Sequence, residues 1–237
     1  MTHKTFFAAI TAFVASFIFG ADVAANDGAY QVVSPDGHLS ATVVVGSDIS
    51  YTVSRDALQL IAPSQISMTL SDGIVFGQDD KVRKVRRDSR DQVWQATVYK
   101  KSDVRDHYNE MTLEFKEFSL TFRAYDDGVA YRFASKLKGD FAVMSEKAEF
   151  AFAKDWDAFI PYVKQHTKTL ETQYFNSFEN TYKEHRLSEW NKSRLAFAPL
   201  VVNADNGVKV LLTEADLLDY PGMFLYNEGD ASTLSAR

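Results

Sequence analysis

Carboxylates are the side chains of this sequence with the widest chemical scope. Two carboxyl groups held roughly 5 to 9.5 Å apart can cleave a glycosidic bond, one as acid and the other as base or nucleophile. Spacing along the chain pairs no two of them, so most are expected to be solvated surface acids. The candidates are Asp106, Glu110, Glu171, Glu179, Glu184, Glu189, Glu214, Asp216 and Asp219.

Other reactive patterns do not occur in the sequence. No two histidines have the i, i+4 spacing of a zinc hydrolase, and there is no Gly-x-Ser-x-Gly or glycine-rich phosphate motif. The absence of cysteine excludes a disulfide framework and a cysteine-based metal site. The run Asp126-Asp127-Gly128 lacks the further oxygen ligands of a calcium-binding loop, so a hairpin turn is favoured there.

Composition indicates an ordinary globular chain. Of the 237 residues, 46% are hydrophobic and 24% are charged, which is enough apolar material for a sizeable core. The net charge is −6 and no long basic run occurs, so there is no reason to expect a nucleic-acid partner.

The N-terminus is typical of a secretory signal. A short basic start is followed by apolar residues 5–20 and by the small residues Val23-Ala24-Ala25, which suit a cleavage site. The alternative is a membrane anchor, but it needs roughly 20 apolar residues, more than this run contains. We therefore expect residues 1–25 to be a signal peptide, and a periplasmic or secreted mature protein that begins at Asn26 and has no membrane contact after cleavage.

Alternating apolar and polar residues predict the elements that must position the candidate side chains. A period of two in residues 39–45, 49–53 and 111–116 is typical of strands with one face in a core. Residues 120–124 and 129–133 alternate on either side of the Asp-Asp-Gly turn, which predicts a hairpin. Because tight turns and not helical spacers separate the strands, we expect an all-β fold, an antiparallel sandwich without a dividing linker.

One region interrupts the strand pattern. From Trp156 to Trp190 the chain alternates poorly and is expected to be a long excursion from the sandwich with a turn or two of helix. Its aromatic side chains would suit stacking against sugar rings, although core packing is their commoner use. These are Trp156, Phe159, Tyr162, Tyr174, Phe175, Phe178, Tyr182 and Trp190.

Three stretches together resemble the N-terminal domain of glycoside hydrolase family 97. They are Ser34-Pro35-Asp36-Gly37, then Arg105–Glu110 with Phe122–Phe133, and finally Leu212–Met223, which contains Thr-Glu-Ala-Asp-Leu-Leu-Asp-Tyr-Pro-Gly-Met. The resemblance spans nearly all of residues 26–237. It implies a β-super-sandwich that precedes a (β/α)8 barrel with the catalytic acids and a small C-terminal β-domain, in a bacterial α-glucosidase or α-galactosidase.

The resemblance also implies a calcium ion at the active site, with one glutamate ligand from the N-terminal domain. The family's ligand segment corresponds here to Phe178-Glu179-Asn180-Thr181-Tyr182 followed by Arg186-Leu187-Ser188-Glu189. This sequence departs from the family pattern at Phe178 and Arg186. Glu179 is therefore the predicted metal ligand. Glu171 lies in a rival alignment through Glu171-Thr172-Gln173-Tyr174, and Glu214 is a further candidate.

The resulting hypothesis is the N-terminal sandwich of a calcium-dependent glycosidase of α-glucosides, without catalytic residues of its own. An α-linked oligosaccharide is the expected substrate, and the catalytic barrel is the expected partner in the same chain. We also expect a truncated C-terminal end, because the apolar run Met223–Tyr226 precedes only a short tail and would leave an unpaired strand edge. The alternative is a carbohydrate-binding or structural sandwich without catalysis.

Overall fold

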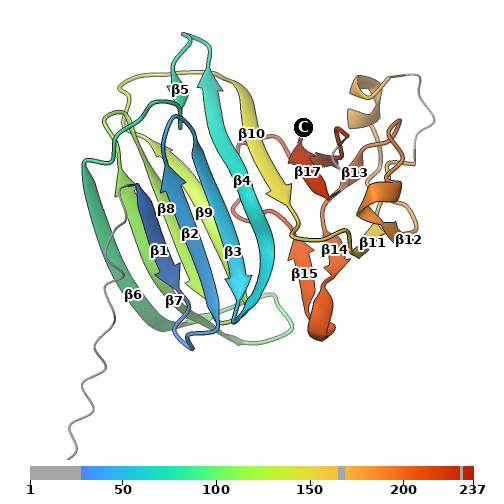
Figure 1. Ribbon diagram of the computed structural model, residues 1–237, viewed down its shortest axis with the longest axis horizontal. Coiled ribbons are helices and arrows are strands. Elements are labelled where there is room, and N and C mark those ends of the chain that lie inside the picture. Colours follow the sequence, from blue (N-terminus) through green and yellow to red (C-terminus); the bar gives the residue numbers. More distant parts are fainter. Residues whose placement is uncertain (1–27, 165–168, 230–231) are drawn as a thin grey trace, which may run out of the picture.

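A computed structural model describes residues 28–164, 169–229 and 232–237. Figure 1 shows a large sandwich built from β1 to β10 and a smaller lobe built from β11 to β17. The described strands form three sheets in which every pair is antiparallel. The predicted all-β, antiparallel sandwich is therefore confirmed. The predicted signal peptide, residues 1–25, lies outside the described residues.

The first sheet runs through both lobes in the order β1-β2-β3-β4-β10-β17-β16-β13, with β5 beside β4. Its strands are β1 (Ala29–Val33), β2 (Leu39–Val45), β3 (Ile49–Arg55), β4 (Leu58–Leu70), β5 (Val75–Phe76), β10 (Val143–Ala151), β13 (Ala196–Phe197), β16 (Phe224–Tyr226) and β17 (Thr233–Ala236). Its continuity from β4 into β10 and β17 ties the smaller lobe to the sandwich.

Two four-stranded sheets complete the fold. One sheet has the strand order β6-β7-β8-β9 and forms the second layer of the sandwich. The other has the order β12-β11-β14-β15 and lies in the smaller lobe. Their strands are β6 (Lys84–Gln95), β7 (Asp103–Glu114), β8 (Phe118–Tyr125), β9 (Gly128–Ser135), β11 (Asp157–Ile160), β12 (Lys183–Arg186), β14 (Leu200–Asn203) and β15 (Lys209–Leu212). No helix of the described residues is long and apolar enough to span a membrane.

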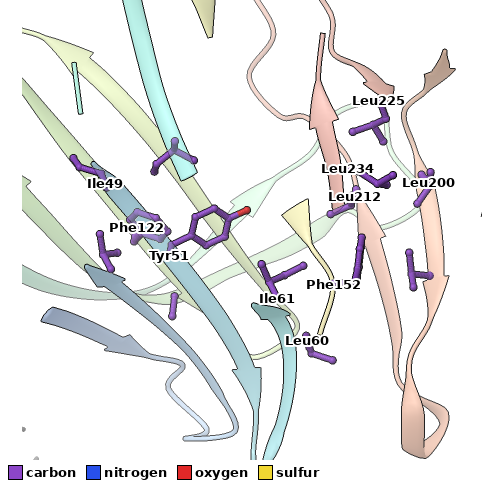
Figure 2. Close-up of a cluster of buried hydrophobic side chains, with 14 of the residues drawn as sticks. Ile49, Tyr51, Leu60, Ile61, Phe122, Phe152, Leu200, Leu212, Leu225 and Leu234 are labelled. Atoms are coloured by element: carbon purple, nitrogen blue, oxygen red, sulfur yellow. The ribbon is translucent and has the colours of Figure 1, made fainter. Parts of the chain in front are cut away.

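The core follows the period-two pattern. On β8, Leu120, Phe122 and Ala124 are completely buried while the residues between them are half-buried. The Tyr51 ring of β3 lies 5.8 Å from the Phe122 ring, so the two layers meet through aromatic contacts. Figure 2 shows this cluster continuing through Phe152 towards the leucines of the smaller lobe, so one core serves both lobes.

The hairpin prediction is confirmed. β8 and β9 pair in register around the Asp126-Asp127 turn, with Tyr125 opposite Gly128. A second tight turn, at Asn206-Gly207, joins β14 to β15, and both residues have the positive φ angles that asparagine and glycine tolerate best.

Two expectations need correction. The excursion from Trp156 to Trp190 contains the expected short helical turns, η1 (Glu171–Tyr174) and η2 (Leu187–Glu189), but also strands β11 and β12, which pair with each other. These strands have only four residues, too few for alternation to show. The expected unpaired edge at Met223–Tyr226 is wrong, because β16 lies between β13 and β17 and Leu225 is completely buried.

Candidate functional site

A surface hollow of about 660 Å³ opens in the smaller lobe. The segment before β12 forms one wall, and the end of β13 with the residues after it forms the other. Glu179 is the acidic residue among its lining residues, which are Lys164, Phe178, Glu179, Asn180, Thr181, Tyr182, Phe197, Ala198 and Pro199. The predicted metal ligand thus lies in the lining of this hollow.

A tight turn positions Glu179. The Asn176 side chain accepts a hydrogen bond from the Phe178 backbone N–H (2.7 Å) and donates one to the Gln173 carbonyl (2.8 Å). Phe178 has a φ of +53°, an unusual value for a phenylalanine. Its ring packs against Phe224, 5.6 Å between centroids, and this contact anchors the residue that precedes Glu179.

Buried amide groups attach this turn to the rest of the lobe. Gln173 is 1% exposed, donates to the Ser193 carbonyl (2.8 Å) and accepts from the Leu195 N–H (3.0 Å). On the other side of Glu179, the Asn180 amide donates to the Tyr162 carbonyl (2.7 Å). The backbone is therefore held both before and after Glu179.

Tyr162 and His185 form a structural pair beside the hollow. The His185 Nδ1 atom lies 2.8 Å from the Arg186 carbonyl, which can only accept, so Nδ1 carries a proton. In the neutral ring, Nε2 then accepts from the Tyr162 hydroxyl, 3.0 Å away. Burial raises the pKa of Tyr162 to about 12, so its hydroxyl stays protonated and available as a donor at neutral pH. Tyr162 is 7% exposed, which indicates a packing role.

The Glu179 carboxylate is exposed and has no hydrogen bond or ion pair with any described residue. A carboxylate oxygen is the ligand type that calcium prefers, but calcium takes about 6 to 8 oxygen ligands. In residues 28–164, 169–229 and 232–237, no three acidic, histidine or cysteine side chains are grouped closely enough to hold a metal ion. Glu179 fits calcium as one ligand of a shell that other groups would have to complete.

The two rival glutamates are engaged elsewhere. Glu171 lies in η1, 3.7 Å from Arg237, and hydrogen bonds from its own backbone N–H and from Thr169 lower the pKa of its carboxyl. Glu214 accepts from the Met223 N–H (2.6 Å) and so closes the coil that follows β15. Neither residue lines the hollow.

Most of the remaining candidate acids have structural partners. Asp106 accepts from Gln92, Glu110 pairs with Arg123 (2.7 Å), Glu189 accepts from the Arg186 N–H, and Asp216 lies 3.5 Å from Arg132. Asp219 lines a second hollow, and Glu184 is exposed on β12. The structure brings none of these acids beside Glu179 in the lining of the first hollow.

The eight aromatic residues of the excursion differ in burial, and Phe159 and Tyr174 are half-buried. Trp156, Tyr162 and Trp190 are buried, as the core-packing interpretation predicted. Phe175, Phe178 and Tyr182 are 85%, 54% and 44% exposed, and the last two line the hollow. Sequence reasoning missed Lys164 and the wall at residues 197–199, because no local pattern links them to Glu179.

The chain matches the family model described as "Glycosyl-hydrolase 97 N-terminal" over residues 32–236. A retaining α-galactosidase of Bacteroides thetaiotaomicron is 43% identical over 209 residues, which are 87% of this chain and 32% of that protein. The chain therefore spans about a third of the length of this relative.

Solved structures agree with this likeness. A glycoside hydrolase family 97 enzyme from Pseudoalteromonas sp. strain K8, in complex with acarbose, has a TM-score of 0.74 at 25% identity over 88% of this chain and 31% of that chain. A β-arabinopyranosidase has a TM-score of 0.75 at 22% identity over 88% of this chain and 35% of that chain, which shows a shared fold.

Proposed function

Since the chain belongs to the glycosyl-hydrolase 97 N-terminal family, we propose that it is the N-terminal sandwich of a secreted, calcium-dependent glycoside hydrolase of α-linked sugars. The family match over residues 32–236 carries this proposal. The chain spans about a third of the length of the proteins that it matches. As the family resemblance implies, we assign the catalytic acid and base to a barrel that follows in the same polypeptide. The sandwich packs on that barrel and supplies one metal ligand.

Glu179 is the residue of this chain that would hold calcium. It lies in the hollow and has no partner among the described residues, so no existing bond must break when it binds a cation. Bound calcium would stabilise negative charge that develops near the ion. The chain's own contribution is to orient the carboxylate, through the Asn176 turn on one side and the Asn180 amide on the other.

Two substrate classes are candidates. α-Glucosides are the class expected from the sequence resemblance. α-Galactosides are favoured by the relative at 43% identity, a retaining α-galactosidase. Activity of the full-length protein on p-nitrophenyl α-glucoside and on p-nitrophenyl α-galactoside distinguishes them. If the full-length protein binds α-linked oligosaccharides but hydrolyses neither p-nitrophenyl substrate, the carbohydrate-binding alternative is supported instead.

The test of the metal role is Glu179→Gln in the full-length enzyme. The amide keeps the shape of the side chain but removes a charge from the calcium shell, so kcat/KM should fall by about tenfold or more and recover partly with excess calcium. Matched variants Glu171→Gln and Glu214→Gln should have smaller effects, since neither residue lines the hollow. Unchanged activity and calcium dependence for Glu179→Gln, with loss of both for Glu171→Gln, would assign the ligand to Glu171.

Secretion is tested separately on the mature protein. Residues 1–25 combine a basic N-terminal region, an apolar run and small residues at the expected cleavage site. N-terminal sequencing of the protein recovered from the periplasm or medium should begin at Asn26. Recovery of an uncleaved chain in the membrane fraction would instead support an anchor.

A further inference from the structure

The strand β6 ends its sheet with a free edge. In the described part of the chain its one strand partner is β7, and all of its residues are exposed except Gln92, which is half-buried. Figure 1 shows β6 at the outer margin of the sandwich. A strand of 12 residues with a free edge is a template for another strand, and on this strand the Ser89 N–H donates to the Asp88 side chain (2.9 Å).

The side chains of β6 are self-complementary. We propose that two copies of this chain pair antiparallel through β6, about a two-fold axis at Ser89. In this register, Asp88 faces Arg90 of the second copy. Arg87, which donates to the Gln31 carbonyl (2.6 Å), faces Asp91, which binds Arg105 of its own chain (2.7 Å). Further out, Val85 faces Val93 and Lys84 faces the Trp94 ring, which places a cation beside an aromatic face. Each opposite-charge contact occurs twice by symmetry.

Neighbouring registers lack this complementarity. A two-fold axis perpendicular to the sheet keeps side chains on their own face, so the next registers are centred on Asp88 and Arg90. The first places Asp88 against itself and Arg86 against Arg90, and the second places Arg90 against itself. Like charges opposite one another destabilise a sheet, so the charge pattern favours the Ser89 register.

The exposed apolar residues of β6 support the same pairing. Val93 and Trp94 are each 59% exposed and Val85 is 37% exposed, which is unusual for large apolar side chains on a strand of charged residues. The proposed register covers all three. Figure 1 places the smaller lobe, which contains β12 and β13, on the side of the molecule opposite β6, so this pairing leaves the hollow with Glu179 open.

Asp88 and Arg90 are the best positions for a test. Both are 55% exposed and lie 3.5 Å from each other within one strand. In the monomer, Arg90→Asp removes this contact, and Asp88→Arg also removes the hydrogen bond that Asp88 accepts from the Ser89 N–H (2.9 Å). In the dimer, Asp88→Arg would place two arginines opposite each other, and Arg90→Asp would place two aspartates opposite each other.

The experiment is sedimentation equilibrium of the full chain at 0.15 M NaCl. The natural chain should show a monomer–dimer equilibrium, and each single reversal should weaken dimerisation at least about tenfold. An equimolar mixture of the two single variants should dimerise again, because each chain then meets the opposite charge. The double variant Asp88→Arg/Arg90→Asp should dimerise like the natural chain.

A matched control is Arg132→Asp on β9, the strand at the other edge of the same sheet, where an exposed arginine is reversed away from the proposed axis. Its dimerisation should be unchanged, and circular dichroism checks the fold of every variant. A natural chain that stays monomeric up to about 100 μM overturns the proposal. Single variants that dimerise normally, or a mixture that fails to recover, also overturn it.

Discussion

At the scale of single residues, Gln173 holds the loop that carries Glu179. Both ends of its amide are used, one by the Ser193 carbonyl and the other by the Leu195 N–H. Because the side chain is 1% exposed, water cannot replace either hydrogen bond without opening the loop. Its shape and its two-sided hydrogen bonding therefore suit a structural role.

Replacing Gln173 with leucine should lower the free energy of unfolding by about 2 to 3 kcal/mol, since two backbone groups lose their partners in a buried site. Urea unfolding measures the change. Gln59→Leu is the control, because Gln59 is exposed on β4, and its effect should stay within about 0.5 kcal/mol. Equal effects of the two substitutions would contradict a structural role for Gln173.

At the scale of elements, the coil between β15 and β16 is attached to the sandwich by polar contacts. The Tyr220 hydroxyl donates to Glu146 on β10 (3.0 Å), and Asp216 lies 3.5 Å from Arg132 on β9. Burial is the largest cause that raises the pKa of Glu146, and the hydrogen bond from Tyr220 opposes it. Glu146 thus binds a proton more readily in the folded than in the unfolded state.

The raised pKa of Glu146 determines how the stability of the folded chain changes with pH. A raised folded-state pKa contributes stability that is fully present below the unfolded pKa and is lost as the pH rises through the folded pKa. Glu146→Gln keeps an acceptor for Tyr220 and does not titrate. The stability of the variant relative to the natural chain should therefore increase between about pH 4 and pH 7.

Urea unfolding at several pH values tests this expectation. Glu184→Gln, at an exposed position of β12, is the control for the substitution itself. A stability difference for Glu146→Gln that does not change with pH would mean that burial of this carboxyl does not perturb its titration.

At the scale of the whole molecule, one core joins the sandwich to the smaller lobe. Phe152 and Leu234 belong to the buried cluster that reaches from the sandwich to the leucines of the smaller lobe (Figure 2). Phe197 lines the hollow and belongs to a second, smaller buried cluster. The lobe with the hollow is thus part of the same folded unit, although the rest of the metal shell and the proposed catalytic groups are assigned to another domain.

The chain on its own should therefore fold but not catalyse. We expect no hydrolysis of p-nitrophenyl α-glucoside or α-galactoside above background by residues 26–237 alone. Cleavage needs two carboxyl groups held roughly 5 to 9.5 Å apart, and the proposal assigns both to the barrel. Calorimetry should show no specific calcium binding by Glu179 alone. Turnover that survives removal of contaminants would contradict the assignment of catalysis to the barrel.

The local pattern of the sequence determined much of the fold. Alternation predicted the buried face of β2, β3 and β8, and turn residues predicted the β8–β9 hairpin, because both signals depend on neighbours in the chain. The motifs around Phe122–Phe133 and Leu212–Met223 were sufficient to identify the family. Glu179 was chosen from its segment alone.

Only the tertiary structure decided how distant segments meet. It placed β16 between β13 and β17, gave Glu214 a backbone partner, and formed the hollow from residues 178–182 and 197–199. Such contacts depend on which surfaces bury one another after the strands have formed. The short strands β11 and β12 exist because of this pairing, since four residues carry too weak a local signal to specify a strand alone.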